Sequence, residues 1–254
     1  MDITVALTWT FAALLLTLRL VPVFAFAPPF SLLNVPVRVR VLLTLMLAVC
    51  LVQLPGAQTS ALRAGLGSFI PLAASELMIG LGIAFAFQAA FAALYFAGRV
   101  LDFQAGFGLA LVIDPATRTQ SPLLGTLLAM VGAAVFFAVD GHHDLLRVIA
   151  ASLEVVPVGA LASGWTPDVV IGHFGMIFAL GLVIAGVAML VLFLTDVSLA
   201  FLMRTMPQMN VLLLGLQVKT IVLLLTLILM SGLLLPAFLR VFEVAIRFIG
   251  QLEP

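Results

Sequence analysis

The side chains with the most familiar chemistry in this chain cluster at residues 140–144. Asp140, His142, His143 and Asp144 are of the types that bind zinc and related metals, and His173 is the third histidine of the chain. Metal-binding histidines on a helix are commonly spaced at i and i+4, so that they share one face. Adjacent histidines are expected to diverge. We therefore predict a polar helix cap after the apolar run 123–139 rather than a metal site.

Motifs of catalysis do not accompany this cluster. The sequence has no G-x-S-x-G nucleophile elbow, no Walker A loop and no H-E-x-x-H zinc motif. We predict a protein that is not an enzyme, binds no cofactor and no metal, and depends on partner proteins or the proton gradient for any energy it uses. A membrane enzyme that uses residues 140–144 is a weaker alternative.

The elements that carry these residues belong to a membrane protein. Hydrophobic residues make up 64% of the chain, charged residues 9%, and the mean hydropathy is +1.33, whereas a water-soluble surface is about 25–35% charged. Eleven basic residues balance eleven acidic ones, which gives no net attraction to nucleic acid. We predict an all-α integral membrane protein built from long, partly broken helical hairpins.

Six apolar runs approach the roughly 20 residues that a membrane helix needs. They are residues 3–26, 41–54, 69–97, 123–139, 169–195 and 211–236. The second is short for a span, and the fifth is long enough to require tilting, bending or projection from the bilayer. The first is expected to be retained rather than cleaved as a secretion signal, because Asp2 stands where a basic region is usual and Arg19 interrupts the apolar stretch. Cys50, the single cysteine, is expected to be buried in the second run.

Ionisable residues occur within or beside these runs. A charge at the centre of a bilayer costs about 2.5–3.5 kcal/mol on insertion scales, so such residues should face protein or water. Two pairings are suggested, Arg19 with Glu76 and Asp196 with Lys219, and snorkelling from a helix end is the alternative. The full set of candidate intramembrane charges is Arg19, Glu76, Arg99, Asp102, Asp196 and Lys219.

Small residues on the third run predict close helix packing. Gly82, Ala86 and Ala90 recur every four residues, and Ala89, Ala93 and Ala97 form a second row. Membrane helices with such faces approach one another closely. The pattern leaves open whether the neighbouring helices belong to this chain or to another.

Polar residues and glycines are concentrated at residues 98–122, between two long apolar runs. Asp114-Pro115 and Ser121-Pro122 each join a helix N-cap to a proline suited to the first helical position. Gly106 and Gly108 allow the backbone to leave a helix. Because non-helical backbone at membrane depth is tolerated only inside protein or beside a cavity, this stretch is either a gate or a solvated loop.

Several of these motifs together resemble the FliR family of flagellar biosynthesis proteins and its counterparts in virulence type III secretion systems. The resemblance covers essentially all 254 residues, although Ala105 and Gln217 stand where methionine and proline are frequent in the family. The matching motifs are Arg19-Leu-Val-Pro22, Pro36-Val-Arg38-Val-Arg40, Gly98, Gln104-Ala-Gly106-Phe-Gly108, Asp114-Pro115, Asp140-Gly-His142-His143 and Met206-Pro-Gln-Met-Asn-Val211 with Gly215 and Lys219.

The resemblance implies a subunit of a type III export gate in the bacterial inner membrane, at the flagellum basal body. FliP-like and FliQ-like subunits would complete a helical assembly around a channel for unfolded export substrates, with a FlhB-like export-switch protein as a further partner. The assembly would be raised largely out of the bilayer plane, in contact with membrane lipid.

The resemblance also implies an internal division and a plug. Residues 1–165 would form a FliP-like part, and residues 166–254 a FliQ-like hairpin with an amphipathic C-terminal helix, for which Arg240, Glu243 and Arg247 have helical spacing. Residues 106–122 would plug the closed channel. The plug residues are expected to be Gly106, Phe107, Gly108, Leu109, Ala110, Leu111, Val112, Ile113, Asp114 and Pro115.

A self-contained secondary transporter for a small solute is the alternative from another class, with residues 98–122 as a broken-helix binding site. Such transporters are commonly built from inverted repeats. Nothing after residue 150 repeats the arrangement of Gly106, Gly108 and Asp114-Pro115, which favours the export gate.

Overall fold

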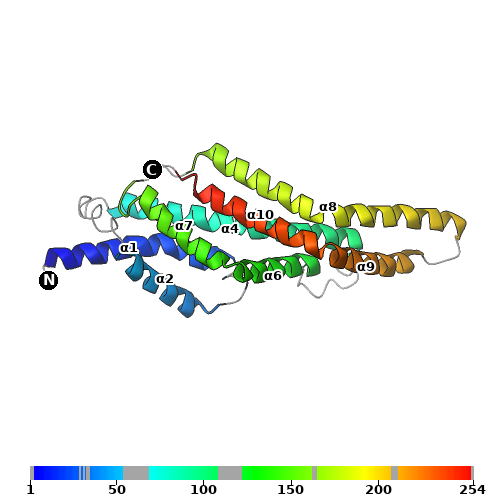
Figure 1. The fold of residues 1–254 in the computed structure, drawn as a ribbon, viewed down its shortest axis with the longest axis horizontal. Coiled ribbons are helices and arrows are strands. Elements are labelled where there is room, and N and C mark those ends of the chain that lie inside the picture. Colours follow the sequence, from blue (N-terminus) through cyan, green and yellow to red (C-terminus); the bar gives the residue numbers. More distant parts are fainter. Residues whose placement is uncertain are drawn as a thin grey trace. The chain divides into compact units, whose positions relative to one another are not determined.

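A computed structural model of the chain describes residues 3–28, 30, 32, 35–53, 69–107, 122–161, 165–206 and 211–252. Within these ranges there is no β-strand, and the prediction of an all-α protein is confirmed. The helices, shown as ribbons in Figure 1, are α1 (Ile3–Phe26), α2 (Val37–Leu51), α4 (Phe69–Ala105), α6 (Leu123–Ala138), α7 (Gly141–Val155), α8 (Pro167–Thr205), α9 (Val211–Leu229) and α10 (Ser231–Ile249).

Three of these helices are long and apolar enough to cross a membrane by themselves. They are α1 over Leu7–Phe26, α4 and α8. The pairs α6 with α7 and α9 with α10 reach the same criterion only when taken together, and each is bent by more than 40° at its break. The described residues therefore provide three to five spans.

The boundaries differ from the predicted runs where charged residues were taken as helix ends. Helix α4 continues through Arg99 and Asp102 to Ala105, and α8 continues through Asp196 to Thr205. The run 211–236 is divided after Leu229, and Pro236 lies inside α10. The predicted C-terminal helix is confirmed as the second part of α10.

The chain forms two compact units. Unit 1 comprises Met1–Ala90, Phe136–Gly175 and Phe242–Pro254, and unit 2 comprises Phe91–Val135 and Met176–Val241. Helices α4 and α8 each contribute one part to either unit.

Aromatic side chains fill the core of unit 1. The Phe136 ring meets the edges of Phe87 and Phe242, with ring centroids 5.9 and 5.4 Å apart. Trp165 stacks on Phe248 and donates its indole N–H to the Phe248 carbonyl at 2.9 Å. This indole also covers Gly82, where a Cβ atom would lie 1.8 Å from the ring. The small residue at position 82 thus accommodates a neighbour from the same chain.

Helix α2 contributes little to the core of unit 1. Only Thr44 and Ala48 are buried along it, and Cys50, which we expected to be buried, is exposed. The helix packs against α1, and most of its large apolar side chains are exposed.

Close backbone contacts define unit 2. A Cβ atom on Gly98 of α4 would lie 2.4 Å from the Leu124 carbonyl of α6, and one on Gly125 would lie 2.9 Å from the Tyr95 carbonyl. Gly181 of α8 approaches the Ala93 carbonyl in the same way, again at 2.9 Å. Ala93 of the second row of small residues on α4 therefore packs against α8 of the same chain.

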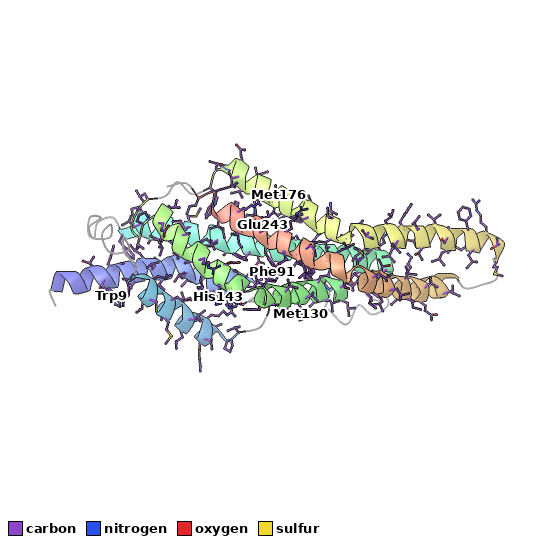
Figure 2. All side chains as sticks on the ribbon, viewed as in Figure 1. Trp9, Phe91, Met130, His143, Met176 and Glu243 are labelled. Carbon is purple, nitrogen blue, oxygen red and sulfur yellow. The ribbon has the colours of Figure 1, made fainter. Side chains whose placement is uncertain are left out.

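Many large apolar side chains point away from both units. Figure 2 labels two of them in unit 2, Met130 on α6 and Met176 on α8, which are 58% and 57% exposed. Exposed apolar surface on this scale indicates lipid or protein contact.

The close approach at Gly98 yields a test of the packing in unit 2. Gly98→Ala should destabilise the chain by about 1–3 kcal/mol, because the added methyl group forces two backbones apart. Gly186→Ala is the matched control on α8, where a Cβ atom meets nothing within 4 Å. This control should be neutral or stabilising by up to about 1 kcal/mol. Unfolding of the chain in detergent, in the form in which it is extracted from the membrane, measures both, and equal effects would contradict the packing.

Candidate functional site

A buried polar cluster in unit 1 begins with the close approach of α1 and α4. A Cβ atom on Gly80 of α4 would lie 2.1 Å from the Arg19 carbonyl oxygen of α1. The two helices can therefore touch only because residue 80 has no side chain. This contact places Arg19 beside Glu76, one turn earlier on α4.

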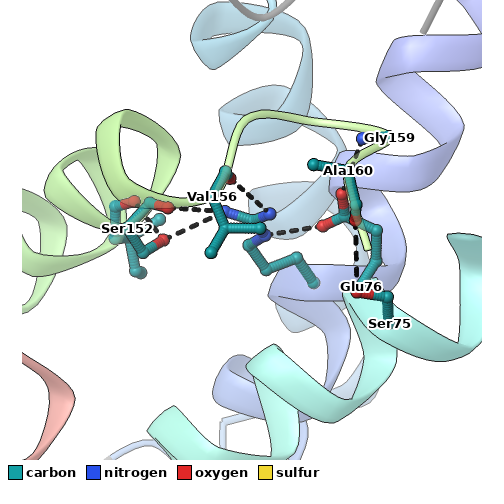
Figure 3. Close-up of polar contacts among 8 residues, drawn as sticks. Ser75, Glu76, Ser152, Val156, Gly159 and Ala160 are labelled. Atoms are coloured by element: carbon teal, nitrogen blue, oxygen red, sulfur yellow. Dashed lines mark hydrogen bonds and ion pairs between the residues drawn. The ribbon is translucent and has the colours of Figure 1, made fainter. Parts of the chain in front are cut away.

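Arg19 and Glu76 form a fully buried ion pair. The Arg19 Nε donates to Glu76 Oε2 at 2.6 Å, and both side chains have zero exposure. The remaining guanidinium nitrogens donate to the Ser152 carbonyl and hydroxyl oxygens at 3.2 Å and to the Val156 carbonyl at 3.0 Å (Figure 3). Every nitrogen of the guanidinium thus has an acceptor.

The segment after α7 completes the cluster. Gly159 has φ of 80°, a backbone conformation that favours glycine, and its N–H donates to Glu76 Oε1 at 3.0 Å. Ser75 donates to the Ala160 carbonyl at 3.2 Å (Figure 3). The cluster therefore fastens α1, α4, α7 and residues 156–160 to one another, and its polar groups satisfy each other without leaving a side chain free for chemistry.

The second polar cluster surrounds the last turn of α4 in unit 2. Asp102 is buried, and its carboxylate accepts from the Leu124 N–H at 3.0 and 3.1 Å and from the Gly125 N–H at 3.3 Å. These donors belong to the first turn of α6, whose N–H groups have no partner within their own helix. Asp102 of α4 therefore caps α6, although it precedes Leu124 by 22 residues in the sequence.

Gln104 and Lys219 hold the same turn from other sides. The Gln104 amide donates to the Met189 carbonyl of α8 at 2.9 Å, and Lys219 of α9 donates to the Gln104 carbonyl at 3.3 Å. Lys219 also pairs with Asp196 of α8. Both ion pairs that the sequence suggested, Arg19 with Glu76 and Asp196 with Lys219, are thus present.

The predicted plug residues lie largely outside the described part of the chain. Gly106 is described and has φ of 87°, with its N–H donating to the Phe103 carbonyl at 3.1 Å, and Phe107 is half-buried. Positions 108–115 of the predicted set, and Ser121, are outside the described residues. Arg99, one turn before Phe103, is exposed.

The histidine cluster differs from the prediction in geometry. The rings of His142 and His143 have centroids 4.2 Å apart, and one possible ligand atom from each of Asp140, His142 and His143 lies within 4.8 Å of the others. The expected divergence of the two rings is therefore wrong. Asp140 lies just after the end of α6, has the left-handed φ of 58° that is common where helices end, and its N–H donates to the Phe137 carbonyl, so a polar residue does follow the run 123–139 as predicted. Its side chain makes no cap bond to α7, which begins directly after it. The absence of a metal stays a prediction.

Sequence reasoning missed the partners that are backbone groups. Ser152, Val156 and Gly159 were not connected to Arg19 and Glu76, and Asp102 was not connected to the start of α6. The predicted cap residue, Ser121, lies outside the described residues. One signal was available for Asp102. It follows Gly98 by four residues, so both face the same neighbour on a helix.

The buried ion pair predicts a large single-variant effect. Arg19→Met leaves the Glu76 carboxylate buried without its cation, which should cost about 3–5 kcal/mol of unfolding free energy. The double variant Arg19→Met with Glu76→Leu should lose less than the single variant, because no uncompensated charge remains. Unfolding in detergent of each variant, in the form in which it is extracted from the membrane, measures both. A double variant as unstable as the single one would contradict this account.

Comparison with known proteins places these clusters in a family context. The chain is 30% identical to the flagellar biosynthetic protein FliR of Bacillus subtilis over 188 residues, which are 72% of this chain and 73% of that protein. It is 27% identical to FliR of Escherichia coli over 202 residues, or 78% and 76% of the two chains. It is 29% identical to the Yop proteins translocation protein T of Yersinia pestis over 153 residues, or 59% and 58%.

The family match extends over both polar clusters. Residues 10–245, from α1 to the last turns of α10, match the family described as bacterial export proteins, family 1. This range includes Arg19, Glu76, Asp102 and Lys219 and spans parts of both units. The chain belongs to the bacterial export proteins of family 1, and is an export component of the membrane rather than an enzyme.

Proposed function

We propose that this protein is a subunit of the flagellar type III protein export gate. In this proposal it assembles with FliP-like and FliQ-like subunits around a channel for unfolded export substrates, and residues 106–122 contribute a plug to the closed state. The assembly lies in the bacterial inner membrane at the flagellum basal body. A FlhB-like export-switch protein contacts it.

The match of residues 10–245 to a family of export proteins is the observation that carries the proposal. A flagellar system is favoured over a virulence system because the alignments to FliR of Bacillus subtilis and Escherichia coli cover 72% and 78% of the chain, against 59% for the Yersinia protein. The division into a FliP-like part, residues 1–165, and a FliQ-like part, residues 166–254, belongs to the same proposal. These two parts are defined by resemblance to other proteins, and their boundary is not that of the two compact units.

The exposed apolar side chains support an assembly rather than a solitary chain. On α8 alone, Ile171, Val183 and Phe201 are 70%, 67% and 64% exposed. A helix that is apolar all round must be covered by lipid or by other helices. Partner subunits that pack along α8 would supply this cover.

Expression with and without partners tests the assembly. We expect the chain to accumulate only when FliP-like and FliQ-like proteins are made with it, and to co-purify with them as one large complex. Size-exclusion chromatography after mild detergent extraction measures this. A stable monomer that binds a small solute without these partners would favour the secondary transporter instead.

Removal of residues 109–113 tests the plug. The deletion should make the assembled gate permeable to ions and small solutes, because it shortens the segment assigned to close the channel. Membrane potential in cells, or conductance of the purified complex in a bilayer, measures permeability. Unchanged permeability in a complex of normal composition would contradict the plug.

A further inference from the structure

The surface between α1 and α2 of unit 1 has a groove with a volume of about 200 Å³. Its lining is apolar except for Arg40, Thr17 and Thr44. Both threonine hydroxyls donate within their own helices, to the Ala13 and Arg40 carbonyls at 2.7 Å, so neither offers a free hydroxyl donor to a ligand. The apolar lining residues are Val21, Ala25, Val37, Val41 and Leu45.

The groove is long, narrow and open. Arg40 Nη1 donates to the Ala25 carbonyl at 3.0 Å, which places the end of α1 beside the start of α2 (Figure 1). The lining continues from there to Leu45, and the rise from Val37 to Leu45 is about 12 Å at 1.5 Å per residue. Pockets for compact solutes usually have roughly 300–1,000 Å³. A groove of this size and form suits an acyl chain better than a compact solute.

Arg40 places a positive charge in the wall of this groove. The side chain is half-buried, and its Nε and Nη1 donate to the Val35 and Ala25 carbonyls, both at 3.0 Å. These bonds hold the guanidinium in place but do not neutralise it, because α1 and α2 contain no acidic residue and no ion pair between described residues includes Arg40. A guanidinium has five N–H groups. Those left over suit an anion from outside the described chain.

The length of α2 places this charge and the groove at matching depths of a bilayer. The helix has 15 residues, or about 22 Å, which is less than the roughly 30 Å of a hydrocarbon core. A long basic side chain near a helix end reaches toward the headgroups, and Arg40 lies in the first turns of α2. From that level the groove extends for about 12 Å, within the roughly 15 Å of a single leaflet.

We propose that the groove between α1 and α2 binds one phospholipid of the surrounding leaflet. The lipid phosphate lies on Arg40, and an acyl chain lies along Val21, Val41 and Leu45. The site prefers lipids with net negative charge, because the uncompensated guanidinium attracts the phosphate while a zwitterionic headgroup also brings a cation to it. The inference rests on the membrane location of this export component and not on the proposed channel or plug.

Two charge variants test the headgroup contact. Native mass spectrometry of the protein, in the form in which it is extracted from the membrane, counts bound lipid as phosphatidylglycerol is added. Arg40→Gln should weaken the tightest adduct about fivefold, the change expected for one basic side chain near anionic lipid. Arg38→Gln is the matched control, because it removes the same charge from an exposed residue of α2 that does not line the groove. It should weaken the adduct less than Arg40→Gln.

A second pair of variants tests the acyl-chain contact and leaves the hydrogen bonds of Arg40 intact. Val39 and Val41 are both 52% exposed on α2, but only Val41 lines the groove. Val41→Phe fills the groove and should weaken the phosphatidylglycerol adduct roughly fivefold or more. Val39→Phe should leave it unchanged. This pair decides the proposal even if Arg40→Gln disturbs the fold.

Three results would overturn the proposal. Equal losses within either pair of variants would mean that lipid is held without a defined site. Equal binding of phosphatidylcholine and phosphatidylglycerol would mean that the charge of Arg40 does not select the lipid. Loss of co-purifying export components in Val41→Phe but not in Val39→Phe, with no lipid adduct on the unaltered protein, would mean that a partner subunit fills the groove. None of these results bears on the channel or its plug, which the deletion of residues 109–113 tests separately.

Discussion

Charge burial is the constraint on which the polar architecture of both units depends. A buried ion needs a partner, because its removal from water costs several kcal/mol and apolar neighbours make no interaction that offsets this cost. Unit 1 meets this need with an arginine and a glutamate whose other polar atoms bond to backbone groups. Unit 2 meets it with the buried Asp102 carboxylate on backbone N–H groups, and beside it a half-buried lysine is held between the partly exposed Asp196 and a carbonyl. In each case the satisfied charge joins segments that are distant in sequence.

These ionic contacts form only where helices come close, and glycine controls that approach. Gly80 lets α1 and α4 meet at Arg19, and Gly98 lets α4 and α6 meet next to Asp102. A methyl group at either position would overlap backbone atoms of the neighbouring helix and push the two helices apart. The hydrogen bonds beside it would then be stretched and weakened. Each glycine and the charged residue one turn away therefore act together: the glycine lets the two helices come close, and the charged side chain then bonds across the short separation between them.

This pairing explains what the sequence could and could not predict. Apolar runs identified the helices because hydropathy follows burial in lipid and protein, and α1 has the predicted bounds. The ends of α4 and α8 were placed too early, since a charge inside a run looks like a helix end until its partner is known. Arg19 and Glu76 could be paired as two opposite charges in apolar surroundings. The roles of Ser152, Val156 and Leu124 could not be predicted, because carbonyl and N–H groups occur at nearly every residue and only the fold selects among them.

The lengths of the two longest helices give a reason for partner subunits that does not depend on family resemblance. Helices α4 and α8 have 37 and 39 residues, or about 55–58 Å at 1.5 Å per residue, whereas a bilayer core is about 30 Å thick. A typical tilt of about 20° shortens their projection by only a few per cent. Part of each helix must therefore lie outside the hydrocarbon. Yet α8 exposes large apolar side chains along its length, from Ile171 to Met203. Since lipid cannot cover all of them and water would not tolerate the remainder, other protein chains must.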